Sequence, residues 1–259
     1  MSDMSSVFPH QMAIRLIDVS IRYRMPTEPV RTIKEQVIRY IQGQRTQYRD
    51  FWGLREVSLD VKQGEFIAFI GRNGAGKSTL LKVAARVLRP TAGRVLIRGT
   101  VASIIELGTG FHPELTGREN IFIHGSMLGY TNKQINLKFN QIVDFAELAE
   151  FIDSPIRTYS TGMIARLGFA IAIDVDPDIL IVDEVLAVGD EAFQQKCIVK
   201  MNQLRQIGVT ILYVTHAVDS LANLCDRAVL IDQGRIRAVG TPRDVIEIYR
   251  HALEPIKPR

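Results

Sequence analysis

Residues 71–79 read Gly71-Arg-Asn-Gly-Ala-Gly-Lys77-Ser78-Thr79. This spacing matches G-x-x-x-x-G-K-[ST], in which backbone N–H groups surround phosphates, the lysine reaches the outer ones and the first hydroxyl ligates magnesium. The apolar run 65–70 has the length and composition of a strand, and 78–87 has helix formers at helical spacing. Strand, glycine loop and helix therefore come in the order that a phosphate-binding loop requires, with the helix N-terminus adding N–H donors.

We expect the phosphates of a nucleotide to contact the whole loop. Its members are Gly71, Arg72, Asn73, Gly74, Ala75, Gly76, Lys77, Ser78 and Thr79. Ser78 is also a candidate magnesium ligand.

Two carboxylates follow a short aliphatic run downstream, in Ile179-Leu-Ile-Val-Asp183-Glu184. Such a run predicts a buried strand that delivers both carboxylates to the edge of a sheet. One carboxylate would orient magnesium and the other an attacking water. A carboxylate pair after a strand is common on protein surfaces, but together with Lys77 and Ser78 it predicts a catalytic site.

Composition predicts a globular chain. Its 259 residues, 46% of them hydrophobic, suffice for one large or two modest cores. No apolar run approaches 18 residues and the first residues lack the features of a signal peptide, so we expect a cytosolic protein. The two cysteines, Cys197 and Cys225, have no metal-type spacing, which favours reduced structural thiols.

Strand and helix patterns alternate along the chain, which predicts an α/β core with a mainly parallel sheet and a helical block at 117–174. The expected strands are 13–23, 54–61, 94–98, 101–106, 179–183, 209–215, 228–231 and 235–239. The expected helices are 78–87, 117–129, 132–148, 161–173, 191–207, 217–224 and one more ending at 250.

The segment 22–55 is strongly basic, with eight Lys and Arg against three Asp and Glu, a net charge of +5. A charged run of this kind is most simply a solvated surface. Ile33, Val37, Ile38 and Ile41 nevertheless repeat at helical spacing, which favours a short amphipathic helix. Trp52, at the end of this segment, could instead fix the insert to the core.

The motifs together resemble the ATP-binding subunit of an ABC transporter over nearly the full length, which we expect to form a single domain, 1–259. The resemblance implies ATP and Mg²⁺ as cofactors and a homodimer with two shared sites. Tyr159-Ser-Thr-Gly-Met163 would be the signature segment, although it departs from Leu-Ser-Gly-Gly-Gln at Tyr159, Thr161 and Met163. In that family Ser160 and Gly162 would touch the γ-phosphate held by the opposite subunit.

The same resemblance assigns the remaining roles. Tyr23 would face adenine, Asp183 would lie on the magnesium side, and Glu184 would be the general base. Asp190 would belong to the loop that crosses to the partner subunit, and His216 would sense the γ-phosphate. The family's usual glutamine is missing from 104–121, where Glu106 lies nearest the expected place. Glu106 is therefore either a metal ligand or a strand-end residue without a catalytic part.

The basic insert, the signature variant and the missing glutamine resemble one subgroup, the ATPases of bacterial polysaccharide exporters. This resemblance implies a polytopic permease as partner, lipid-linked polysaccharide as cargo, no nucleic acid, and a peripheral place on the cytoplasmic face of the inner membrane. We expect no C-terminal carbohydrate-binding domain after His216. The alternatives are the ATPase of a drug or small-solute exporter, and a soluble ABC protein acting on ribosomes or DNA; a P-loop kinase would explain neither 159–190 nor His216.

Overall fold

The computed structural model describes residues 11–26, 48–104, 110–174, 176–183, 190–215, 218–221 and 224–253. These residues form two sheets. The smaller sheet has the order β2-β1-β4, with β1 (Met12–Pro26), β2 (Tyr48–Lys62) and β4 (Ala92–Ile97). The larger has the order β5-β6-β7-β3-β8-β9. Its strands are β3 (Phe66–Ile70), β5 (Val101–Ile104), β6 (Ile179–Val182), β7 (Thr210–Val214), β8 (Arg227–Asp232) and β9 (Arg235–Gly240).

Parallel pairing dominates the larger sheet, and only β9 runs antiparallel to its neighbour β8. Every residue of β3, β6 and β7 is buried. These strands read as continuous apolar runs because both faces of the sheet are covered. One face packs on the antiparallel sheet and on α3 (Lys77–Ala84), and the other packs on helices. The predicted α/β class with a mainly parallel sheet and an antiparallel part is confirmed.

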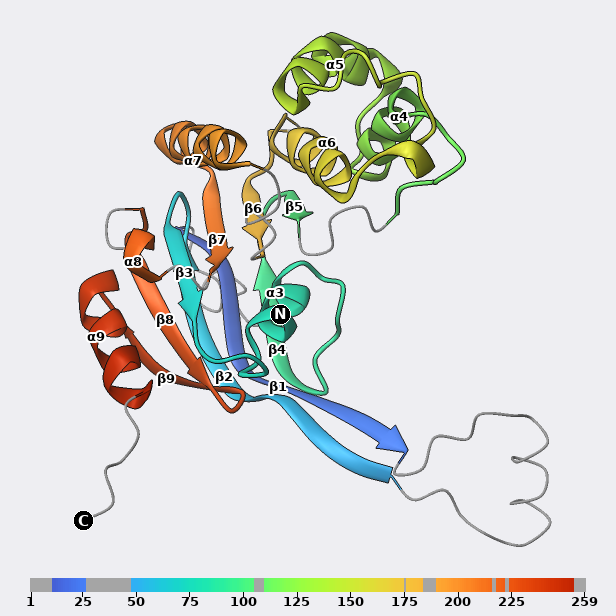
Figure 1. Cartoon of the computed structure of the whole chain (residues 1–259). Helices are drawn as coiled ribbons and strands as arrows, with labels where there is room; N and C mark the ends of the chain where they lie inside the picture. Colours follow the sequence, from blue (N-terminus) through green and yellow to red (C-terminus); the bar gives the residue numbers. More distant parts are fainter. Residues whose placement is uncertain are drawn as a thin grey trace, which may run out of the picture.

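The helical block lies to one side of the sheets (Figure 1). It contains α4 (Gly117–Met127), α5 (Asn132–Ala146), the short helix η1 (Ile156–Thr158) and α6 (Thr161–Asp174). Thr116 and Thr131 start α4 and α5 with capping boxes. In each, the threonine side chain accepts the N–H of the residue three positions later, and the side chain of that residue, Glu119 or Gln134, accepts the N–H of the threonine. The block has its own buried cluster around Ile121, Leu167 and Ala170.

The remaining helices are α7 (Glu191–Gln206), α8 (Val218–Leu221) and α9 (Pro242–Leu253). Of the helix expected at 217–224, the described residues hold only α8. Within the described ranges, no helix combines the length and the apolar character needed to cross a bilayer.

The basic segment begins and ends as an antiparallel ribbon, which the sequence did not predict. The expected strands stopped at Tyr23 and restarted at Leu54, but β1 and β2 stay paired out to Pro26 and Tyr48. This ribbon extends away from the rest of the molecule (Figure 1). Charged residues interrupt the apolar alternation there, and cation–π contacts join the strands instead, with Arg24 4.6 Å from the ring centre of Tyr48. The amphipathic helix expected within 27–47 lies outside the described residues.

Both cysteines are packed in the core. Cys197 on α7 and Cys225 before β8 belong to the same buried cluster, and neither is in a disulfide. Burial raises the pKa of Cys197 to about 12 and that of Cys225 to about 11. Thiols so far above their ordinary pKa stay protonated and unreactive at neutral pH, which agrees with the structural role expected for them.

Candidate functional site

The glycine loop joins the end of β3 to the start of α3, and its shape excludes side chains at two positions. A Cβ added at Gly71 would lie 2.1 Å from the Ile231 carbonyl oxygen, and one at Gly76 would lie 2.5 Å from the Gly53 carbonyl oxygen. Both residues also have positive φ, 151° and 111°, which favours glycine. The loop is therefore fixed against β8 and β2 before any ligand binds.

Lys77 is the buried charged residue of this loop and is only 6% exposed. Its Nζ donates to the carbonyls of Gly71 at 2.7 Å and Arg72 at 3.1 Å. A buried ammonium beside the N-terminus of a helix makes a strongly positive cradle. The donor set therefore suits the phosphates of a nucleotide.

A cavity of about 350 Å³ opens in front of the loop. Asp183, which follows β6, lines this cavity together with Lys77 and Ser78. A carboxylate and a hydroxyl are the oxygen ligands that Mg²⁺ prefers beside phosphates, so these residues fit magnesium as well as the nucleotide. The full lining is Phe51, Gly53, Asn73, Gly74, Ala75, Gly76, Lys77, Ser78, Thr79, Asp183 and Val214.

Parallel strand ends explain why residues so distant in sequence meet here. The loop leaves β3 after Ile70, and Asp183 leaves β6 after Val182. Strand β7 lies between β3 and β6 and is parallel to both. The carboxyl ends of parallel strands form one edge of a sheet, which is where open α/β sheets place their ligands.

An aromatic ring that the sequence analysis did not name lines the cavity beside Tyr23. Tyr23 has its hydroxyl 3.3 Å from the Thr79 hydroxyl, and its ring lies against Gly53. The ring facing the cavity is Phe51, which is 50% exposed and stacks on Tyr23 with ring centres 6.4 Å apart. Sequence reasoning missed Phe51 as a site residue. The signal that could have found it is the cross-strand pairing of Tyr23 with Phe51 in β1 and β2.

Ser160 and Gly162 lie in the helical block, at the start of α6, and do not line the cavity. The Ser160 hydroxyl accepts the N–H of Met163 at 3.2 Å. Among the described residues, a Cβ at Gly162 would meet only the Ser160 hydroxyl, at 3.7 Å, so this part of the chain leaves open space around Gly162. The N-terminus of α6 is thus accessible to a group from outside.

Two of the three departures from the usual signature, Tyr159 and Met163, have a packing reason. Tyr159 is buried, and its hydroxyl donates to the Phe151 carbonyl at 2.6 Å. Met163 packs against the buried cluster of the helical block. These two side chains stabilise the block, while Ser160 stays exposed.

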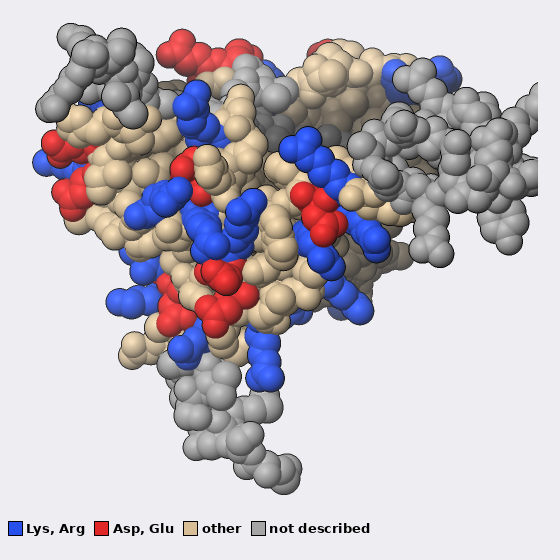
Figure 2. Space-filling view, turned by 90° about the horizontal axis from the view of Figure 1, so that it is seen from below, with Lys and Arg blue, Asp and Glu red and all other residues tan. Residues whose placement is uncertain are grey.

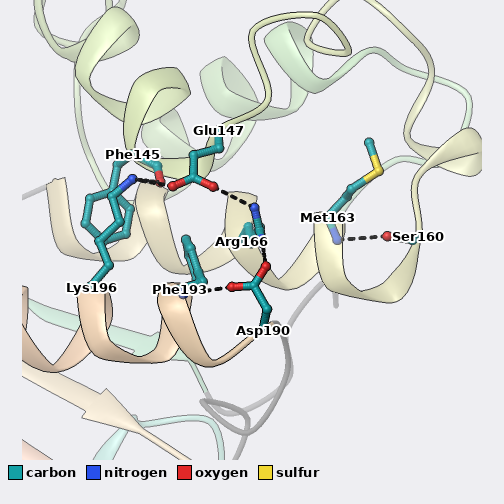
Figure 3. Close-up of polar contacts among 8 residues, drawn as sticks. All are labelled: Phe145, Glu147, Ser160, Met163, Arg166, Asp190, Phe193 and Lys196. Atoms are coloured by element: carbon teal, nitrogen blue, oxygen red, sulfur yellow. Dashed lines mark hydrogen bonds and ion pairs between the residues drawn. The ribbon is translucent and has the colours of Figure 1, made fainter.

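Asp190 is the first described residue after Asp183 and caps α7. Its Oδ1 accepts the N–H of Phe193 at 2.9 Å, and its Oδ2 contacts Nη2 of Arg166 at 2.6 Å (Figure 3). Both carboxylate oxygens are therefore bonded within the chain. Glu106, Glu184 and His216 lie outside the described residues.

Comparison with known proteins identifies the family. The model of the ABC transporter family matches residues 54–187. The O-antigen export system ATP-binding protein RfbB of Klebsiella pneumoniae is 51% identical over 205 residues, 79% of this chain and 83% of that protein. The RfbB of Myxococcus xanthus is 46% identical over 93% of this chain and 56% of that protein. The teichoic acids export ATP-binding protein TagH of Enterococcus faecalis is 44% identical over 80% of this chain and 48% of that protein.

Solved structures agree on the fold. An ATP-binding cassette solved as a dimer in a post-hydrolysis state with ADP and Pi matches with a TM-score of 0.72 at 21% identity, over 89% of this chain and 99% of that chain. An ATP-binding subunit of an ABC transporter matches with a TM-score of 0.72 at 22% identity, over 94% and 96%. The family model covers more than half of the chain and close relatives cover most of it, so the protein belongs to the ABC transporter family as an ATP-binding subunit.

Proposed function

We propose that this protein is the ATP-hydrolysing subunit of an exporter that moves lipid-linked polysaccharide across the bacterial inner membrane. The observation that supports ATP hydrolysis is the single cavity shared by Lys77, Ser78 and Asp183. The cargo is supported by relatives named for O-antigen and teichoic acid export. The subunit would work as a homodimer beside a polytopic permease, at the cytoplasmic face of the membrane.

Each residue of the site has its own role in binding or hydrolysing ATP. Backbone N–H groups of 73–79 and the Lys77 ammonium bind the phosphates, and the Ser78 hydroxyl and Asp183 carboxylate hold Mg²⁺, with Glu106 as a further candidate ligand. When bound, the metal neutralises negative charge on the phosphates. Glu184 would take a proton from the attacking water, and His216 would contact the terminal phosphate.

The second half of each site would come from the partner. The N-terminus of α6 carries partial positive charge, and Gly162 leaves open space there. A phosphate held by a second subunit could approach Ser160 and Gly162 closely, because no side chain of the described residues crowds Gly162. Dimerisation would therefore be part of the chemistry.

The basic segment 22–55 would face lipid-headgroup phosphates or the permease. Its described ends carry Arg22, Arg24 and Arg49 on the ribbon, and Tyr48 is 51% exposed there. Lys and Arg contribute about 1 kcal/mol each near an anionic membrane surface, so the segment could guide docking but could not replace a protein partner. On the face in Figure 2, the described Lys and Arg side chains are interspersed with Asp and Glu, which disfavours a nucleic-acid surface there.

Co-purification tests the exporter assignment. The protein, isolated with mild detergent from its own membranes, should bring down a polytopic membrane protein, and the complex should hydrolyse ATP faster when lipid-linked polysaccharide is added. Association with ribosomes or DNA instead would favour the soluble alternative. Stimulation by small hydrophobic solutes but not by the lipid-linked polymer would favour a drug exporter.

Glu184→Gln tests the general base. The amide cannot accept the proton of the attacking water, so hydrolysis should fall by roughly 10²- to 10⁴-fold while ATP binding persists. Phosphate release and equilibrium binding of ATP measure the two effects separately. Glu191→Gln, an exposed carboxylate in the first turn of α7, is the matched control and should keep normal turnover. Near-normal hydrolysis by Glu184→Gln would refute the assignment.

Alanine variants of Tyr23 and Phe51 test whether these rings stack on the adenine of ATP. Base stacking on an aromatic ring contributes about 1–3 kcal/mol, so Tyr23→Ala should weaken ATP binding by that amount. Phe51→Ala should have an effect of similar size, because Phe51 faces the cavity and Tyr23 supports it. Tyr23→Phe keeps the ring and should bind ATP nearly normally. Unchanged ATP affinity in both alanine variants would mean that adenine stacks on another part of the protein.

A further inference from the structure

A second cavity lies between the helical block and α7. Its volume is about 500 Å³, within the range of sites that hold small molecules. Its walls come from α5, α6 and α7, and none of its described lining residues also lines the cavity in front of the phosphate loop. We call it the α5–α7 cavity. A ligand bound there would not compete with a nucleotide.

Four charged side chains line the α5–α7 cavity, and their formal charges cancel. Asp144 on α5 and Asp174 at the end of α6 are the two carboxylates. Lys196 and Lys200 on α7 are the two ammonium groups. Because residues four apart lie on the same face of a helix, both lysines are directed to the helical block. The cavity therefore presents negative groups on one wall and positive groups on the opposite one.

Asp174 lacks a hydrogen-bond donor. Its Oδ2 is buried and has no hydrogen-bond partner among the described residues, whereas most buried polar atoms in proteins have one. Burial also raises the pKa of Asp174, as expected for a carboxylate removed from water. The nearby Lys138 donates to the backbone carbonyl of Asp174 and, at 2.6 Å, to Asp176. It does not bond to the buried oxygen, so this wall of the cavity can accept a donor from a ligand.

The two lysines of the cavity differ in their contacts. Lys196 is fully engaged, since its Nζ donates to the Phe145 carbonyl at 3.0 Å and contacts Glu147 Oε1 at 2.9 Å (Figure 3). Lys200 acts on Asp174 through its charge, but within the described part of the chain the two side chains form no ion pair. Opposite charges thus face one cavity without closing on each other, which leaves room for a molecule between them.

The charges restrict what the cavity can bind. A metal ion is disfavoured, because the lysines repel it and no group of three His, Cys, Asp or Glu in the described residues could hold one. A simple anion would be repelled by the carboxylates. An apolar molecule would leave the buried oxygen of Asp174 unpaired, which is costly. The lining fits a molecule with a hydrogen-bond donor at one end and an anionic group at the other.

We propose that the α5–α7 cavity binds a small zwitterionic molecule, such as an amino acid or phosphoethanolamine. Its ammonium group would donate to the buried oxygen of Asp174, and its anionic group would lie beside Lys200. The bound molecule would contact the helical block and α7 at once. This second site depends neither on the cargo nor on ATP hydrolysis, because it shares no described lining residue with the ATP cavity.

Thermal melting of the intact protein tests the site, with the ATP cavity filled by a non-hydrolysable ATP analogue and Mg²⁺. The probes are the common amino acids and phosphoethanolamine at millimolar concentration. At least one should raise the melting temperature by about 2 °C or more, because a ligand that binds only the folded state stabilises it. Isothermal titration calorimetry then measures the affinity of the best probe. Asp174→Asn should weaken its binding by about tenfold or more and Lys200→Gln by about two- to fivefold.

Glu150→Gln and Lys133→Gln are the matched controls. Both residues are exposed in the helical block and lie outside the cavity lining, so these variants should bind the probe as the natural protein does. Melting without the probe shows whether each variant folds, and if Asp174→Asn does not, Lys200→Gln decides.

Three outcomes would overturn the proposal. Stabilisation by none of the probes would mean that the cavity holds water only. Equal probe affinity in the natural protein and Asp174→Asn would place the binding elsewhere. Equal stabilisation by a neutral sugar such as glucose would remove the need for charge. Failure of the proposed function looks different, because ATP binding and hydrolysis are measured without the probe.

Discussion

Parallel pairing of β7 with both β3 and β6 is the constraint on which the site depends. The register sets Phe69 opposite Val214 and Val182 opposite Tyr213, so the three strands end at one edge of the sheet. A phosphate loop leaving β3 and a carboxylate leaving β6 must then meet. The pairing that forms the core therefore also forms the site.

Backbone contacts with segments distant in sequence fix the shape of the phosphate loop. The Gly234 N–H donates to the Ala75 carbonyl at 2.8 Å, and the Arg55 N–H donates to the Gly234 carbonyl at 2.8 Å. Gly71 and Gly76 allow the carbonyls of Ile231 and Gly53 to come close. The antiparallel sheet and the turn after β8 are thus parts of the nucleotide site, although they hold no catalytic residue. Preorganised N–H donors of this kind need no rearrangement when an anion binds.

Sequence reasoning was most informative where the geometry is local, since the residues 73–79 and Asp183 that it grouped together line one cavity. The loop 71–79 and Asp183 are recognisable because short spacings determine their geometry, and the parallel sheet follows from alternating strands and helices. Phe51 was missed because its place depends on pairing across a ribbon whose charged residues hide the strand pattern. The contact of the Asp190 carboxylate with Arg166 was not predicted, because it depends on how α6 packs beside α7; the place of Asp190 in a loop that reaches the partner stays a prediction. The roles of Glu106, Glu184 and His216 stay predictions.

The central claim is that each ATP site combines the phosphate loop of one subunit with Ser160 of the other. Mixing two inactive variants, Lys77→Ala and Ser160→Arg, tests it directly. A mixed dimer would contain one site with both natural parts, so random mixing should restore about a quarter of the natural ATPase activity if the sites are independent. If each ATP site instead lay within one subunit, every site in the mixture would carry an inactivating substitution and no activity would return. No recovery on mixing, with mixed dimers demonstrated by differently tagged subunits, would contradict the account.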